Sequence, residues 1–172
     1  MSKDDLPRLR CAPLAVPLRI VLVEPEIPQN TGNIARLSAA TQSPLHLVGR
    51  LGFRIDEHAV RRAGLDYWHL VDLSQHPTLD AFREAHPASR LRLFSAVGGR
   101  SYLEADFQPG DALVFGREST GLPPALLDAH PGSVFGIPTL GAVRSLNLAN
   151  SAAIVVYEAL RQVGALGRPA PG

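Results

Sequence analysis

The chain has 172 residues, of which 45% are hydrophobic, and its formal net charge at pH 7 is +1. This length fits one domain, and the apolar content is sufficient to bury a core without disulfides or a structural metal. The nearly balanced charge excludes a uniformly attractive field for nucleic acid or membrane, so any RNA-binding surface must be a local patch.

The cysteine, histidine and hydropathy patterns exclude several kinds of protein. A single cysteine, Cys11, excludes an intramolecular disulfide and any multi-cysteine metal site, which is consistent with a reducing cytoplasm. The histidines include no pair four residues apart on a predicted helix, so we expect no bound metal. No apolar run approaches the roughly 20 residues of a membrane span. We therefore expect a cytoplasmic protein without a membrane segment.

The elements expected along the chain alternate between strands and helices. Residues 1–17 carry three prolines and mixed charge, and we expect them to form a flexible extension. Apolar runs predict strands at 18–24, 44–49, 90–97, 111–116 and 133–138. Helical spacing and helix-ending residues predict helices at 30–42, 56–64, 78–86, 123–130 and about 146–163. This alternation predicts one α/β domain over residues 18–172, with a mainly parallel sheet and helices on both faces.

The loops that follow the predicted strands contain the most unusual residues. Ligands bind beyond the carboxyl ends of the strands in such sheets, and the corresponding loops here are EPEIPQNTGN, SAVGGR, FGRESTGLP and IPTLGAVRSLN. No G-x-G-x-x-G follows a strand, and neither G-x-x-x-x-G-K-[ST] nor G-x-S-x-G occurs. A dinucleotide-binding site, a P-loop kinase and a serine hydrolase are therefore disfavoured.

Several polar residues in these loops have a structural as well as a functional interpretation. Asn30 and Asn33 stand at a predicted helix start, where a side-chain oxygen caps free amides. Glu118 fits a solvated loop or a cap of the helix that follows it. Arg36 lies near the carboxyl end of a strand, so a catalytic role and a surface role are both open.

The last predicted helix begins with a cluster of polar residues. Asn147, Ser151, Glu158 and Gln162 are spaced by four, seven and four residues and so form one stripe along the helix. Capping by Ser145 would explain one hydroxyl, but the cluster exceeds the needs of a cap. We therefore interpret the polar face as a ligand site or a subunit interface.

Three strings of the chain resemble, in order, the signature motifs of the SPOUT superfamily of S-adenosylmethionine-dependent RNA methyltransferases, in its 2'-O-ribose branch. They are NTGNIAR, FGRESTGLP and IPTLGAVRSLNLANSAAIVVYEA. The strings VLVEPEIPQNTGN and RRAGLDYW are similar to the small single-domain subfamily that methylates the wobble ribose of tRNA, at C34 or U34. The resemblance implies a homodimer that completes each active site and a carboxyl-terminal trefoil knot. Periodicity alone does not show a knot, because knots are rare exceptions.

The resemblance also implies roles for individual residues. The cofactor, S-adenosyl-L-methionine, would be held by backbone of the knotted loops, at positions that match Ala96, Gly116, Ile137, Ser145 and Leu146. The positions that match catalytic residues are Arg36, Glu118, Ser145 and Asn147. Asn30 supports them and is also a candidate RNA-binding residue. The chain departs from the family only in its 17-residue extension and in the TLGAV string.

Methyl transfer to a ribose needs the hydroxyl oxygen in line with the sulfonium methyl group, at about 3 Å. Because a guanidinium stays protonated at neutral pH, we expect Arg36 to stabilise the developing alkoxide or to hold the neighbouring phosphate. An arginine acting as the base is the alternative. Ser145 and Asn147 would orient the reacting groups, and Glu118 would fix Arg36 or the loop geometry.

The adjacent Arg61 and Arg62 are the candidate contacts to tRNA phosphates, with Tyr67 or Trp68 offering an aromatic face to an unstacked base. The two arginines would also suit the negative end of a helix dipole. Two other functions remain open. One is a related methyltransferase acting on another tRNA position or on rRNA, and the other is a non-catalytic knotted RNA-binding module.

Overall fold

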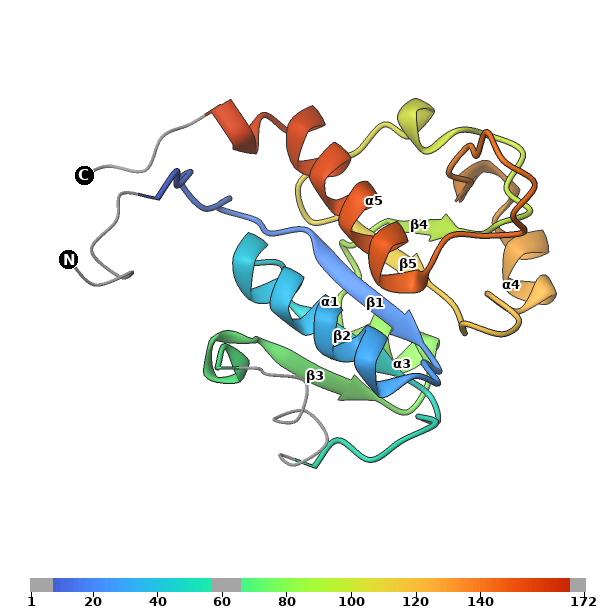
Figure 1. The fold of residues 1–172 in the computed structure, drawn as a ribbon, viewed down its shortest axis with the longest axis horizontal. Helices are drawn as coiled ribbons and strands as arrows, with labels where there is room; N and C mark the ends of the chain where they lie inside the picture. The colour runs from blue at the N-terminus through green and yellow to red at the C-terminus, as the bar shows by residue number, and fades with distance from the viewer. Residues whose placement is uncertain (1–7, 57–65, 168–172) are drawn as a thin grey trace.

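The computed structural model describes residues 8–56 and 66–167, and within these ranges six strands form one parallel sheet (Figure 1). The strand order is β3-β2-β1-β5-β4-β6. The strands are β1 (Arg19–Val23), β2 (Leu45–Val48), β3 (Leu73–His76), β4 (Leu91–Phe94), β5 (Ala112–Phe115) and β6 (Val134–Phe135). The predicted α/β fold with a mainly parallel sheet is confirmed.

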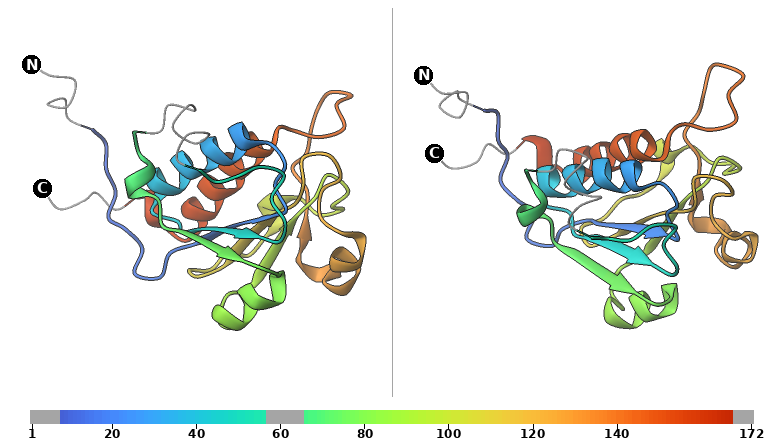
Figure 2. Two further views of the ribbon diagram at one scale, coloured as in Figure 1. Left: turned by 90° about the horizontal axis from the view of Figure 1, so that it is seen from below. Right: turned by 60° about the horizontal axis from the view of Figure 1, so that its bottom comes forward.

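Helices cover both faces of the sheet, as predicted. The α-helices in the described ranges are α1 (Pro28–Thr41), α3 (Leu79–Ala85), α4 (Pro124–Ala129) and α5 (Leu148–Gln162). Short 3₁₀ turns are η2 (Trp68–Leu70), η3 (Tyr102–Glu104), η4 (Pro131–Ser133) and η5 (Ala165–Gly167). Helices α1 and α5 lie side by side on one face, and α3 and α4 lie on the other (Figure 2). None of the helices in the described ranges is long and apolar enough to cross a bilayer.

The central strands are apolar throughout because each contributes to two cores. Ile20 and Leu22 of β1 pack into the core under α1 and α5, whereas Val21 and Val23 pack into the core under α3 and α4. Side chains alternate between the faces of a strand, so a strand buried on both faces reads as a continuous apolar run. This is why β1, β2, β4 and β5 are recognisable in the sequence.

Some elements differ from the predictions. Strand β3 is not predicted, because its residues LSQH lack an apolar run. It lies at the edge of the sheet and pairs only with β2, so less of it needs to be buried. The strand predicted at 133–138 is shortened to Val134–Phe135. The helix predicted at 56–64 lies almost wholly outside the described residues. The boundary predicted near residue 18 remains a prediction, and Leu14 already packs against the core.

The candidate site is positioned by the order of the strands. The chain runs outward from β1 through β2 to β3, and later strands fill the other side of β1, where β5 is its neighbour. Crevices form at such a topological switch point because the loops leave adjacent strands in different directions. The loop after β1 and the loop after β5 therefore meet at one edge of the sheet.

Candidate active site

Glu118, in the loop after β5, binds the amino end of α1. Its carboxylate accepts hydrogen bonds from the backbone N–H groups of Glu26 at 2.8 Å and Ile27 at 3.0 Å. Ile27 is the N-cap residue of α1 and offers no side-chain cap, so the carboxylate of a distant loop takes that place. A negative charge at a helix amino end is favourable because it meets the free N–H groups and the positive end of the dipole. The predicted capping of the following helix is wrong, because the helix that Glu118 binds precedes it in the chain.

Asn30 joins Glu118 to Asn147. Asn30 is buried in the first turn of α1; its Nδ2 donates to Glu118 Oε1 at 3.3 Å and its Oδ1 accepts from Asn147 Nδ2 at 3.0 Å. The prediction that Asn30 or Asn33 caps the helix is wrong, because α1 begins at Pro28 and Asn30 lies inside it. The amide instead links two elements that are far apart in the sequence.

Asn147 is the N-cap of α5. Its Oδ1 accepts from the backbone N–H groups of Ala149 at 2.9 Å and Asn150 at 3.2 Å. The predicted capping by Ser145 is therefore wrong, and Ser145 is exposed with no hydrogen bond from its hydroxyl to other described residues. The amino ends of α1 and α5 are thus tied together through Glu118, Asn30 and Asn147.

The loop after β1 also binds the loop after β5 through its own acidic side chains. Glu26 accepts hydrogen bonds from the backbone N–H of Ser119 at 2.9 Å and from its hydroxyl at 2.9 Å. These bonds lower the pKa of Glu26 from its ordinary value of 4.5. Glu24 pairs with Arg117, whose Nε lies 3.0 Å from the carboxylate. These contacts between the two loops are not predicted from the sequence, where they are indicated only by the acidic residues after one strand and the Arg-Glu-Ser string after another.

Arg36 stands apart from this network. It lies six residues beyond Asn30 on α1, about 9 Å further along the helix axis. Its side chain is exposed, and its guanidinium carbon lies 4.9 Å from the centre of the Tyr67 ring. Within the described residues it makes no hydrogen bond or ion pair, so Glu118 fixes the loop geometry rather than Arg36.

The residues predicted to line a cofactor pocket follow three neighbouring strands. Ala96, Gly116 and Ile137 come shortly after β4, β5 and β6, which are adjacent in the sheet. The loops after β4 and β6 are hydrogen-bonded to each other, with Ser95 N donating to Phe135 O at 3.0 Å and Gly136 N to Arg100 O at 2.7 Å. The structure therefore brings these three positions to the same edge.

Two glycines in these loops allow close backbone contact. A Cβ atom at Gly116 would lie 2.2 Å from the carbonyl carbon of Gly121, and one at Gly98 would lie 2.4 Å from that of Phe135. Gly121 itself has a φ of +71°, in the region that favours glycine. A side chain at either crowded glycine would force backbone segments apart at the edge that carries the predicted pocket.

The segment between β6 and α5 carries the other two pocket candidates. Residues 138–145 are exposed, and Leu146 is half-buried just before α5. In Figure 2 this segment projects from the body of the molecule as an open loop. Its backbone is therefore accessible to a ligand beside the loops after β4 and β5.

Part of the polar stripe predicted on α5 is satisfied within the chain. Gln162 accepts a hydrogen bond from the backbone N–H of Phe107 at 3.2 Å and donates to Glu158 at 2.9 Å. The pKa of Glu158 is lowered, mainly by its hydrogen bond from Arg161. Only the amino end of the stripe thus belongs to the candidate site.

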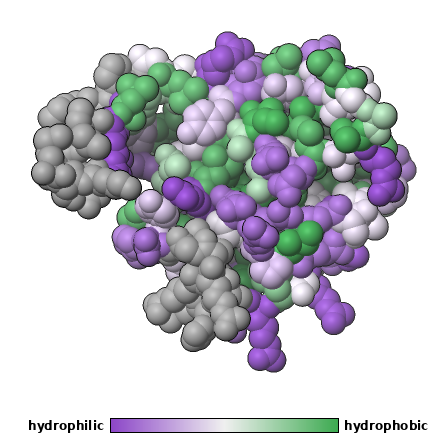
Figure 3. Space-filling model, in the orientation of Figure 1, coloured by the Kyte–Doolittle hydropathy of each residue, from purple (hydrophilic) through white to green (hydrophobic). Residues whose placement is uncertain are grey.

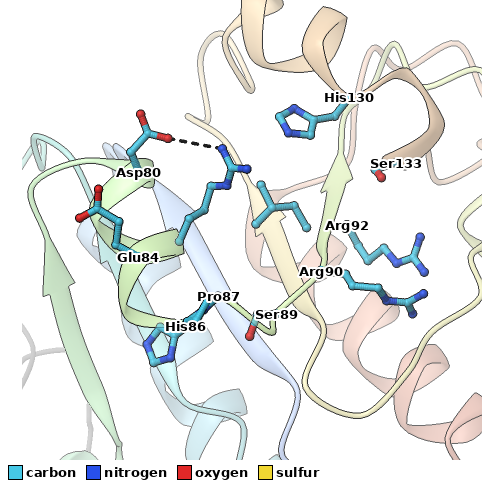
Figure 4. Close-up of a pocket in the computed structure, with 11 residues that line it drawn as sticks. Asp80, Glu84, His86, Pro87, Ser89, Arg90, Arg92, His130 and Ser133 are labelled. Carbon is cyan, nitrogen blue, oxygen red and sulfur yellow. Dashed lines mark hydrogen bonds and ion pairs between the residues drawn. The ribbon is translucent and has the colours of Figure 1, made fainter.

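A hollow lies elsewhere, between α3, α4 and the start of β4 (Figure 4). It has a volume of about 730 Å³ and contains none of the predicted site residues. Arg90 and Arg92 on its wall are bound to the Asp111 carboxylate at 2.8 and 3.3 Å. These guanidinium groups thus already have an internal anion as partner. The RNA-binding candidates Arg61 and Arg62 lie outside the described residues.

Comparison with known proteins gives the family. Residues 17–157 match the SpoU rRNA Methylase family. The tRNA (cytidine(34)-2'-O)-methyltransferase of Burkholderia pseudomallei is 47% identical over 148 residues, covering 84% of this chain and 95% of that protein. A solved structure that addresses the 2-OH methylation of C/U34 on tRNA is 49% identical, with a TM-score of 0.80, over 86% of this chain and 96% of the other.

A more distant solved structure shows the same fold. The AdoMet-bound rRNA methyltransferase from Sinorhizobium meliloti is 24% identical, with a TM-score of 0.76, over 88% of this chain and 61% of that one. The family match spans most of the present chain, and the Burkholderia relative aligns over nearly its whole length. This chain therefore belongs to the SpoU rRNA methylase family.

Proposed function

We propose that this protein transfers a methyl group from S-adenosyl-L-methionine to the 2'-hydroxyl of the wobble ribose, at C34 or U34, in tRNA anticodon loops. The names of its similar relatives support this substrate. The observation that carries the proposal is the network of Glu118, Asn30 and Asn147, which ties the amino ends of α1 and α5 together beside the exposed hydroxyl of Ser145. This arrangement fixes backbone and side chains where a ribose and a cofactor would meet.

The cofactor would lie on the backbone near Ala96, Gly116, Ile137, Ser145 and Leu146. Membership of the family implies the carboxyl-terminal trefoil knot, and these positions lie in its loops. S-adenosyl-L-methionine supplies an electrophilic methyl group on a sulfonium. The crowded glycines support this placement indirectly, because they let the loops that would bind the cofactor pack closely against one another.

Four residues of the chain would have separate roles in the methyl transfer. The exposed guanidinium of Arg36 would stabilise the developing alkoxide or hold the adjacent phosphate, because it offers up to five donors and stays charged. Ser145 has a free hydroxyl to orient the ribose. Asn147 acts as a positioning residue, since its amide oxygen caps α5 and its Nδ2 donates to Asn30. Glu118 positions the loops.

A homodimer would complete each site. Several large apolar side chains are exposed around the candidate site and along α5 and η3, and Figure 3 shows apolar surface on the face that carries α1 and α5. They are Ile27, Val97, Leu103, Leu140, Val143, Ile154 and Tyr157. Burial of such residues against a second copy is favourable. A second copy would also bring an Arg36 to cofactor loops that Arg36 does not contact within its own chain.

The direct test is a labelled-methyl assay on bulk tRNA that lacks the modification, followed by nucleoside mapping. The proposal expects label on the 2'-oxygen of nucleotide 34. Label at another tRNA position or in rRNA would assign the related methyltransferase activity, and cofactor binding without transfer would assign an RNA-binding module. Either result would refute the proposed function.

Binding of tRNA is tested separately with an Arg61→Ala, Arg62→Ala double variant. If both arginines contact phosphates, the variant binds tRNA more weakly, and the log-log slope of affinity against salt falls by about one to two units. Cofactor binding should stay unchanged. An unaltered slope and affinity would remove both arginines from the RNA-binding surface.

A further inference from the structure

A cluster of three histidines lies on the face of the sheet away from α1 and α5. His46 comes from β2, His76 from the end of β3, and His86 directly follows α3. One nitrogen of each ring lies within 4.8 Å of the other two. His46 Nδ1 and His76 Nε2 are 3.0 Å apart, and the rings of His46 and His86 have centroids 4.8 Å apart. The proposed methyl transfer uses none of them.

The hydrogen bonding of this cluster is incomplete. His46 is only 2% exposed, and its Nε2 is buried without a partner. Its neighbour Phe82 contacts it edge to face, with ring centroids 5.0 Å apart, and offers no acceptor or donor. Buried polar atoms almost always have partners. This nitrogen is on the other side of the ring from Nδ1, the atom that faces His76, so an ion between His46 and His76 would bind Nδ1 and leave Nε2 unpaired. The two histidines at 3.0 Å also share a single proton at best, which leaves lone pairs in the cluster.

The imidazole rings of the three histidines are neutral, which is the form that binds a metal ion. Burial is the main cause that lowers the pKa of His46 to about 3, and burial also lowers the pKa of His76 and of His86. All three rings are therefore neutral near pH 7, and a metal ion would not have to displace a second proton from any of them.

The ligand atoms of the cluster favour some metal ions over others. Among the described residues, no carboxylate belongs to the cluster, and Arg19, held by Ser89 at 3.2 Å, acts on both His46 and His86 and opposes any bound cation alike. Hard ions such as Ca²⁺ and Mg²⁺ need oxygen ligands, so the lack of carboxylates disfavours them. Neutral imidazoles instead suit Zn²⁺, Cu²⁺ and Ni²⁺, which bond to nitrogen.

We propose that His46, His76 and His86 form a binding site for a Zn²⁺ ion. Three nitrogens at about 2.0–2.1 Å from zinc, with one water, make a tetrahedral site. Such bond lengths set nitrogens about 3.3 Å apart, so the present 3.0 Å contact would widen by a few tenths of an ångström, and the widest pair, now up to 4.8 Å apart, would close by up to about 1.5 Å as the His86 ring moves in. His86 also borders the hollow of Figure 4, with its ring turned away from Arg90 and Arg92.

The ion would add a direct link between three elements that already pack together. Strand β3 is an edge strand whose only partner in the sheet is β2, and α3 packs against both strands. A metal bound to one residue of each would hold this edge of the domain together. It would act on stability and not on methyl transfer, because the cluster lies on the face opposite α1.

The test uses the full chain after treatment with a chelator, titrated with Zn²⁺ alone. We expect one zinc per chain by calorimetry and by metal analysis after dialysis, and a melting temperature that rises with zinc concentration. Replacement by Co²⁺ should give visible absorption typical of a tetrahedral nitrogen site.

Variants at the two half-buried histidines make the test specific. His76→Asn and His86→Asn should each weaken zinc binding at least about tenfold and abolish the zinc-dependent rise in melting temperature. The control is His130→Asn, which alters another histidine at the same hollow and should leave zinc binding unchanged. A zinc content near zero in the wild type, or equal binding by wild type and the His76→Asn, His86→Asn double variant, would overturn the proposal.

Discussion

Substitution of Glu118 should loosen the amino end of α1 and with it the candidate site. Glu118→Ala removes two backbone hydrogen bonds to a carboxylate, from Glu26 and Ile27, and a third from Asn30. A hydrogen bond to a charged group contributes about 1.5–3 kcal/mol, and loss of an N-cap costs about 1 kcal/mol. Because Glu118 is only half-buried and water can replace it, we expect a loss of about 2–3 kcal/mol rather than the full sum.

Urea unfolding and thermal melting measure this loss. For a chain of this size, about 2–3 kcal/mol corresponds to a fall in melting temperature of about 4–12 °C. Glu118→Gln keeps one acceptor oxygen and should lose about half as much, while methyl transfer falls in both variants because Asn30 is no longer held. The control is Glu84→Ala, at an exposed carboxylate on α3, which should change neither property. If the Glu118→Ala variant had the same melting temperature as the wild type, the capping role would be refuted.

Three further substitutions separate catalysis from folding. Arg36→Ala should abolish methyl transfer and cost only about 0.5–1 kcal/mol, the contribution of its cation–π contact with Tyr67; normal turnover would remove it from the catalytic set. Asn147→Asp keeps the cap oxygen of α5 but loses the donor to Asn30, so turnover should fall while the melting temperature stays within a few degrees; unchanged turnover would show that this link is unnecessary. Gly98→Ala should destabilise by about 1–3 kcal/mol, because its Cβ would meet backbone at 2.4 Å. Gly99→Ala, with no atom within 4 Å, is the matched control in denaturant unfolding, and equal midpoints for the two variants would contradict the crowding.

Local patterns in the sequence determine most of the elements. Strands buried on both faces must be apolar throughout, which makes β1, β2, β4 and β5 visible as runs. Helix α5 is visible from its apolar spacing, although its start shifts to Leu148 because Asn147, and not Ser145, caps it. Such signals extend over a few residues, because propensities and caps act between near neighbours. The loops after the strands could thus be identified as the place where a ligand would bind.

Only the tertiary structure decides which of those loops meet and what each polar side chain does. Glu118 binds the N-cap residue of α1, Ile27, which lies 91 residues earlier in the chain, and Asn30 bonds to Asn147 across 117 residues. The three histidines likewise come from β2, β3 and the end of α3, and no spacing along the chain relates them. Such contacts depend on the order of strands in the sheet. Strands β1 and β5 are neighbours in the sheet although β2, β3 and β4 lie between them in the chain, and this pairing brings the loops that follow them together.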